Sequence, residues 1–179
     1  MSQSYGRAPE AWKIGKLVYG DGLSLNIAKK MLEAGEKEAN KQGVPMVMAV
    51  CDSGGNLLAF RRMDNAMLCS IQIALDKAYT AVLGKQHTAQ FGNAYKMGEL
   101  VPLFFHERWI TFPGGFPLIK SGVILGGIGV SGGIVEDLYV AREALKGGDF
   151  STSEVDEIIS QNDKALHGNS KIKSQISKP

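Results

Sequence analysis

The chain has 179 residues and 22 of them are glycine, about 12 % where about 7 % is usual. Hydrophobic residues make up 44 % and charged residues 21 %. These ordinary values exclude disordered, collagen-like and disulfide-scaffold proteins and fit a globular chain with a real core. The formal net charge of +2 gives no electrostatic reason to expect a nucleic-acid or acidic-membrane partner.

The sequence contains no recognisable targeting signal and no cysteine motif that would indicate a function. No apolar run approaches the ~20 residues of a membrane span, and the first 16 residues contain no signal-peptide hydrophobic segment. Cys51 and Cys69 match no metal-binding spacing, and a disulfide between them stays open. We therefore expect a cytoplasmic protein that binds neither membranes nor nucleic acid.

The first predicted element is a helix of about five turns beginning near Leu23. Asp21 is the expected N-cap, and Gly43 with Pro45 ends the helix. Its apolar residues form two strips on opposite sides, so we expect cover on both. The strips are Leu23, Ile27, Met31 and Ala34 on one side and Leu25, Ala28, Leu32 and Ala39 on the other.

Two hairpins are predicted on either side of a second helix. Residues 46–51 and 57–60 flank an Asp-Ser-Gly-Gly-Asn turn, which is typical of a hairpin. Because both runs are continuously apolar, we expect strands covered on both faces. Residues 113–119 and 123–130 form the second predicted hairpin, around a turn at 120–122.

The second helix should run from about residue 67 to 83 and end at Gly84. The predicted core stripe of this second helix is Leu68, Ile71, Leu75, Ala78 and Val82. A short helix and an irregular aromatic loop are expected over residues 85–112.

Two further helices are predicted near the C-terminus. One starts near Val135, buries Leu138, Ala141, Ala144 and Leu145, and ends at Gly147-Gly148. A capping-box pattern at 151–154 opens a last short helix, followed by a frayed polar tail over 167–179. This order of helices and hairpins favours antiparallel strands and disfavours a doubly wound parallel sheet.

A G-x-G-x-x-G pattern occupies Gly127–Gly132. Dinucleotide binding would require these glycines at a strand-to-helix turn inside a β-α-β unit. Here the first two lie within an apolar run and no second strand follows. The competing interpretation is that they let another backbone or a ligand approach the strand closely, while Gly132 and Gly133 form the turn into the next helix.

Several charged residues have both a structural and a functional interpretation. Lys77 is either a surface lysine or a cation facing a pocket or subunit interface. Glu136 and Asp137 either interact with the helix dipole or present carboxylates at a site near Gly132. Arg62 either pairs locally with Asp64 or binds a carboxylate ligand.

The chain has three histidines. His167 lies in the polar tail and is set aside. His87 follows the second helix, where its side chain could donate a hydrogen bond to the last carbonyl oxygens of that helix. His106 and Glu107 lie in the aromatic loop with Trp109, the most site-like environment in the sequence. A histidine there suits a general base or an axial haem ligand, or makes only a local hydrogen bond.

Five motifs in order resemble the GlcG/HbpS/PduO C-terminal domain family of small bacterial proteins, over roughly residues 22–146. The motifs span residues 49–58, 62–64, 74–81, 113–118 and 127–133. The resemblance implies a profilin-like α+β fold, a three-layer α/β/α arrangement with a five-stranded antiparallel sheet, assembled into homo-oligomers. We divide the chain into an extension (1–20), a GlcG/HbpS-like domain (21–150) and a C-terminal helix with a polar tail (151–179).

The residues described above and the resemblance leave two functions open, and the missing first-helix histidine and the site-like loop favour the first. The first is a catabolic enzyme, of hydrolase or lyase type, for a small carboxylated organic acid. Its catalytic residues would be His106, Glu107 and Lys77, and its substrate-binding residues Arg62, Gly114, Gly115, Trp109 and Asp137. The second is a protein that binds haem or a related tetrapyrrole, with His106 or His87 as axial ligand. Some relatives ligate haem through a histidine near the start of the first helix, where this chain has Gly22, Leu23 and Ser24.

Overall fold

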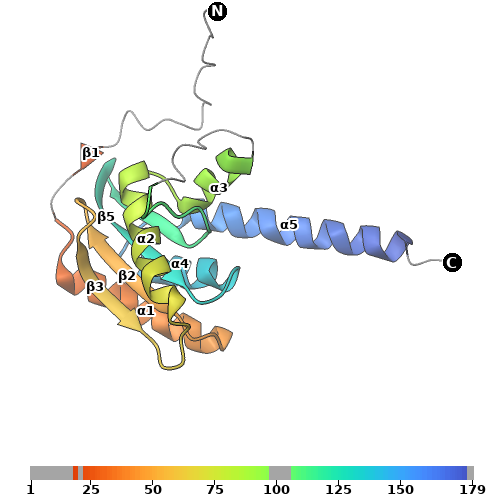
Figure 1. Cartoon of the computed structure of the whole chain (residues 1–179), viewed down its shortest axis with the longest axis horizontal. Helices are drawn as coiled ribbons and strands as arrows, with labels where there is room; N and C mark the ends of the chain where they lie inside the picture. Colours follow the sequence, from red (N-terminus) through yellow and green to blue (C-terminus); the bar gives the residue numbers. More distant parts are fainter. Residues whose placement is uncertain (1–17, 20–21, 97–105, 177–179) are drawn as a thin grey trace, which may run out of the picture.

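The computed structural model describes residues 18–19, 22–96 and 106–176, with side chains described up to residue 164 except at 18, 19 and 95 (Figure 1). Helices and strands alternate in groups, without a repeating β-α-β pattern. The strands are β1 (Val18–Tyr19), β2 (Val47–Asp52), β3 (Leu57–Arg62), β4 (Gly115–Lys120) and β5 (Val123–Ser131), and the helices are α1 (Leu25–Gln42), α2 (Cys69–Gly84), α3 (Thr88–Lys96), α4 (Glu136–Gly147) and α5 (Ser153–Ile176).

Four strands form an antiparallel sheet in the order β4-β5-β2-β3. Both predicted hairpins, β2–β3 and β4–β5, are present, and the fold is α+β. The fifth strand, β1, has two residues and pairs parallel with β5 at Val123 and Ile124. The prediction of five antiparallel strands therefore holds for four of them.

Helices cover both faces of this sheet. On one face α2 packs against β5, β2 and β4, and on the other α1 and α4 pack against each other and the sheet. Along β2, Val47, Ala49 and Cys51 belong to the cluster under α2, whereas Met48 and Val50 belong to the cluster under α1 and α4. Two-sided cover explains why the run is continuously apolar.

The second strand of this hairpin differs from the prediction. β3 is partly exposed along its length, and Leu57 and Phe60 are 55 % and 38 % exposed. It pairs with β2 alone among the described strands, and α1 touches it while α2 does not cover it. An apolar run by itself does not distinguish a central strand from an edge strand.

Helix α1 begins at Leu25, two residues later than predicted. Its N-cap is Ser24, whose side-chain oxygen accepts a hydrogen bond from the amide of Ile27 at 3.2 Å. Asp21, the expected cap, lies outside the described residues. The helix ends as predicted at Gly43, which adopts the left-handed conformation with φ +68°.

Glycines in β5 decide how α2 sits on the sheet. A Cβ on Gly129 would lie 2.0 Å from the carbonyl oxygen of Ala74, and one on Gly127 would lie 2.6 Å from that of Ala78. The G-x-G-x-x-G pattern thus serves close helix–strand packing. Its first two glycines lie inside β5, as that interpretation requires.

The predicted core stripe of α2 is confirmed at Ala78 and Val82 and needs correction at its start. The face against β5 carries Ala74, Lys77, Ala78 and Ala81, all at most 2 % exposed, whereas Leu68 is 72 % exposed. Small residues occupy the interface because the two backbones nearly touch. The helix also ends differently, since Gly84 is its last residue and Lys85 takes the left-handed cap position.

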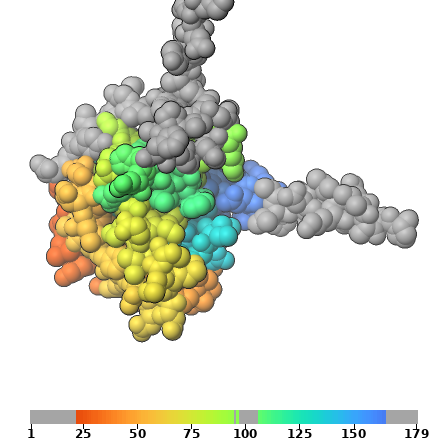
Figure 2. Space-filling model, viewed as in Figure 1, coloured from red at the N-terminus to blue at the C-terminus, as the bar shows by residue number. Residues whose placement is uncertain are grey.

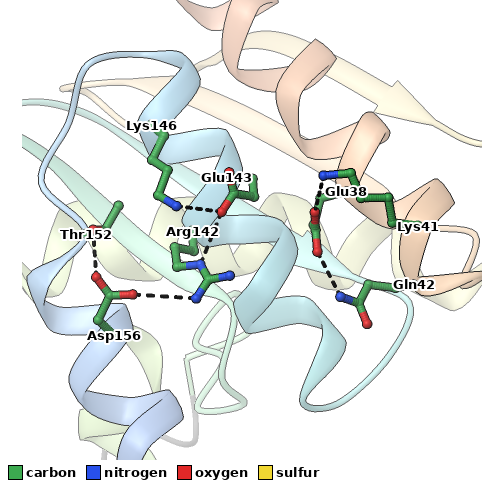
Figure 3. A network of polar contacts seen from close by, with 8 residues as sticks. All are labelled: Glu38, Lys41, Gln42, Arg142, Glu143, Lys146, Thr152 and Asp156. Carbon is green, nitrogen blue, oxygen red and sulfur yellow. Dashed lines mark hydrogen bonds and ion pairs between the residues drawn. The ribbon is translucent and has the colours of Figure 1, made fainter.

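The C-terminal helices confirm one prediction and correct another. Helix α4 buries Leu138, Ala141, Ala144 and Leu145 as predicted. Helix α5 is longer than expected, because its backbone stays helical to Ile176 and projects from the body of the molecule (Figure 1). Figure 3 shows its first turn held to α4, where Arg142 lies between Glu143 and Asp156.

Cys51 is buried and Cys69 exposed, and both are free thiols, so no disulfide joins them. Among the described residues, no helix has the length and apolar character needed to cross a membrane.

Candidate functional site

Two of the predicted site residues form a buried ion pair. Lys77 of α2 and Asp137 of α4 are each 2 % exposed. The Lys77 Nζ donates to Asp137 Oδ2 and to the carbonyl oxygen of Val130, both at 2.7 Å. The other carboxylate oxygen of Asp137 accepts from the amide of Gly133 at 2.9 Å. One pair therefore ties α2, β5 and the start of α4 together.

Gly114 and Gly115 lie against this pair. A Cβ on Gly114, which has φ +112°, would lie 3.0 Å from the Lys77 Nζ, and one on Gly115 would lie 2.6 Å from the Lys77 carbonyl oxygen. The amide of Gly115 donates to Thr88 Oγ1 at 3.1 Å. The space around these glycines is filled by protein atoms. Gly114 and Gly115 therefore serve the packing of β4 against α2.

Burial shifts the pKa of both members of the pair. It lowers the pKa of the Lys77 amine and raises that of the Asp137 carboxyl, and in each case the partner's charge opposes the shift. Glu136, the neighbouring acid, instead accepts from the amide of Ile134 at 3.1 Å. The two adjacent acids thus point to different partners, and both satisfy the turn that precedes α4.

The predicted catalytic residues are not brought together. His106 and Glu107 are exposed, and His106 stacks on Tyr79 with ring centroids 6.2 Å apart. Tyr79 follows Lys77 by two residues, about 200° around the helix, so His106 and Lys77 lie on different sides of α2.

Trp109 and Arg62 also lie apart from the ion pair. Trp109 packs edge-on against Phe91 of α3, with centroids 4.8 Å apart. Arg62 is exposed at the end of β3, in register with Val47, and therefore two strands from β5. The residues predicted for one site are thus distributed over three places.

A cavity with a volume of about 870 Å³ lies between α3 and α5. One wall is the exposed face of α3 with the segment that precedes it, and the other is the first three turns of α5. The wall residues from α5 are Glu154, Glu157, Ile158, Gln161 and Asn162, and Thr111, Phe112 and Pro113 close one side. This volume is within the range of small-molecule and cofactor sites.

His87 is the lining residue best suited to bind a ligand. It stacks on Phe116 with ring centroids 6.0 Å apart. Its Nδ1 is buried and has no hydrogen-bond partner among the described residues. Burial lowers the pKa of the imidazole, and the nearby Glu157 carboxylate opposes that shift. The ring is therefore neutral at pH 7, which is the form that ligates metals.

Sequence reasoning placed His87 among the haem-ligand candidates but missed the rest of this cavity. Glu157, Ile158 and Gln161 lie on one face of α5, at spacings of one, three and four residues. Their spacing indicates a helix face but says nothing of what that face meets. Thr88 was also missed, since a lone threonine at a helix start has no distinctive signal.

The fold and this cavity define a small α+β protein with a ligand-sized pocket between α3 and α5. A family described as "Haem degrading protein HbpS-like" matches residues 23–146, and the chain belongs to this HbpS-like family. The matched region contains α1 to α4 and the four antiparallel strands. It ends before α5, so one wall of the pocket lies beyond it.

Two curated relatives show the range of proteins that contain this domain. An uncharacterized 15.0 kDa protein from the dhaT-dhaS intergenic region of Citrobacter freundii is 42 % identical over 127 residues, 69 % of this chain and 89 % of that protein. The corrinoid adenosyltransferase PduO of the same organism is 35 % identical over 127 residues. That alignment covers 69 % of this chain but 38 % of PduO.

Solved structures agree with this assignment. Protein ORFY of Klebsiella pneumoniae has a TM-score of 0.70 and 36 % identity, covering 73 % of this chain and 92 % of that one. A complex of PduOC with heme has a TM-score of 0.69 and 29 % identity, covering 73 % and 98 %. The resemblance to the GlcG, HbpS and PduO proteins drawn from five sequence motifs is thereby confirmed.

Proposed function

We propose that this protein binds haem or a related tetrapyrrole in the cavity between α3 and α5, with His87 as the axial ligand. One observation carries the proposal, namely a neutral imidazole that lines a cavity of about 870 Å³ and whose buried Nδ1 has no hydrogen-bond partner within the described part of the chain. Kinship to PduOC, which has been solved in complex with heme, supports the same ligand class.

Several of the lining residues suit such a ligand. Nδ1 of His87 is buried, so Nε2 is the nitrogen that would meet the metal. Phe112, Pro113 and Ile158 offer apolar contacts to a flat ring, and Lys96 offers a cation to its carboxylates. When bound, haem supplies a redox-active iron whose behaviour depends on its axial ligand. The chain's own contribution is to hold that ring and to present an uncharged imidazole.

Titration with hemin tests the proposal. Wild-type protein should give a sharp Soret shift that saturates at one haem per chain. The variant His87→Ala should bind hemin at least about tenfold more weakly and lose the histidine-ligated spectrum, since a ligand of the metal is removed. Imidazole added to this variant should restore that spectrum.

The matched control is His106→Ala. His106 is exposed and stacks on Tyr79, outside the residues that line the cavity, so its loss should leave the Soret position unchanged. An unaltered titration in His87→Ala, or a broad shift that survives both substitutions, would show that hemin binds elsewhere or without specificity.

The hypothesis that the sequence favoured, an enzyme for a small carboxylated acid, has less support. It requires His106, Glu107 and Lys77 in one site, whereas Lys77 is buried against Asp137 and the other two residues are exposed. Arg62 is also distant from that pair in the strand order. Haem binding needs a single pocket residue to be correctly placed and is therefore the better-supported function.

A further inference from the structure

Residues 106–113 form a segment, here named the strap, that crosses α2 and leads to the pocket. Figure 2 shows it in green, lying on the yellow surface of α2. The Thr80 hydroxyl donates to the carbonyl oxygen of Arg108 and accepts from the amide of Ile110, both at 3.0 Å. Thr80 is fully buried, so one helix residue satisfies two backbone groups of the strap.

An ion pair fastens the same part of the strap. Asp76 of α2 is 4 % exposed, and its carboxylate accepts from Arg108 Nε and from Gln72 Nε2, each at 2.9 Å. The Arg108 guanidinium also lies 3.8 Å from the centroid of the Tyr79 ring. Arg108 supplies the positive charge that faces the buried Asp76 carboxylate. Removing Arg108 therefore leaves the negative charge of Asp76 unpaired.

The other end of the strap meets α3 and the pocket. The buried Thr88 hydroxyl donates to the carbonyl oxygen of Phe112 at 2.5 Å. A Cβ on Gly92 would lie 2.7 Å from the carbonyl oxygen of Thr111, so the glycine lets the strap lie directly on α3. Thr111 and Phe112 both line the cavity. The strap therefore links an ion pair on α2 to one wall of the pocket.

We infer that Arg108 is a positioning residue for the ligand pocket, acting through the strap that it holds on α2. The inference rests on the proposed function, because it concerns the cavity lined by His87. Arg108 does not line that cavity, so its effect reaches the ligand only through the placement of Thr111 and Phe112. A ring bound there needs this wall in place to exclude water from one side.

Hemin binding by Arg108→Gln tests the inference. The variant should bind about tenfold more weakly, in the range typical of coupling between sites, mainly through faster release. Its Soret position should stay that of the wild type, because His87 is untouched. The control is Lys120→Gln, which removes an exposed cation paired with Asp149. Affinity in this control should be unchanged.

A double-mutant cycle separates the ion pair from other effects of the arginine. In the background Asp76→Asn, the substitution Arg108→Gln should change hemin affinity much less than it does in the wild type, because the pairing is already lost. Equal effects in the two backgrounds would show that Arg108 acts without Asp76 and would overturn the inference.

Trp109 gives a readout that does not depend on hemin. It lies in the strap against Phe91, and Trp12 is the other tryptophan. In the background Trp12→Phe, Arg108→Gln should red-shift the emission and increase acrylamide quenching. An unchanged emission would mean that the strap stays in place and would overturn the inference. If emission shifts as expected but wild-type protein binds no hemin, the strap holds and the proposed function fails.

Discussion

At the scale of single residues, the Lys77–Asp137 pair shows why composition and spacing leave a charge ambiguous. The sequence allowed Lys77 to be a surface lysine or a cation facing a pocket or a subunit interface, whereas the structure buries it against Asp137. The position of Lys77 within α2 is compatible with both alternatives and so does not decide between them. Burial follows from the glycines of β5, which draw that side of α2 onto the sheet, and from Asp137, which lies 60 residues away.

Removing one member of the pair should be costly. Lys77→Met leaves a buried carboxylate without its cation and should lower the free energy of unfolding by about 3–5 kcal/mol. The double variant Lys77→Met, Asp137→Leu should recover much of that loss. Urea denaturation at pH 7 measures both. Equal stability of the single and double variants would contradict a direct pairing.

The same substitution should strengthen the local response to pH. Burial raises the pKa of Asp137, and in Lys77→Met the opposing charge is gone. The folded state then binds a proton that the unfolded state releases, so stability is gained as pH falls through the raised folded pKa towards the ordinary value of Asp. Denaturation of Lys77→Met between pH 7 and 5 should show a gain relative to wild type. A parallel dependence in both proteins would contradict this.

The two cysteines should differ in reactivity. Burial raises the pKa of the Cys51 thiol to about 12, whereas Cys69 is exposed. The thiolate is the reactive form, so a thiol reagent at pH 8 should label Cys69 in the native protein and both residues after unfolding. Mass spectrometry of the labelled peptides identifies the site. Rapid native labelling of Cys51 would mean that β2 opens readily.

At the scale of elements, the contact between α2 and β5 decides most of the architecture. The sequence predicted both elements and gave the correct structural interpretation of the glycines between them. The predicted core stripe of α2 is confirmed at Ala78 and Val82, and Ile71 and Leu75 pack against the same cluster. It wrongly included the exposed Leu68 and omitted Ala74 and Ala81, because hydrophobicity was taken as the guide. Small side chains mark the true interface, since only they allow the two backbones to approach.

This interface should tolerate no added carbon. Gly129→Ala places a Cβ 2.0 Å from the Ala74 carbonyl oxygen, which requires α2 to move and should cost about 3 kcal/mol of stability. Gly122→Asn is the control, because Gly122 faces open space at φ +76° and asparagine tolerates that conformation. Thermal unfolding compares them. A melting temperature for Gly129→Ala equal to that of the control would contradict the close packing.

At the scale of the whole molecule, the expectation of a homo-oligomer remains a prediction. The edge strand β3 exposes Leu57 and Phe60 on the face that α2 leaves uncovered. Apolar side chains on an unpaired edge favour association. Sedimentation of wild-type protein should exceed the 19.3 kDa of one chain, and Phe60→Lys should shift it towards the monomer. A wild-type monomer would contradict the prediction.

The chain by itself determined the order of its elements, both hairpins and membership of the HbpS-like family, because local periodicity, turn residues and ordered motifs are properties of neighbouring residues. It also listed His87 as a ligand candidate. Only the tertiary structure decided that Lys77 pairs with Asp137, that β3 is an edge strand, and that α5 faces α3 across a pocket. Those outcomes depend on contacts between segments far apart in the chain, whose packing no local pattern records.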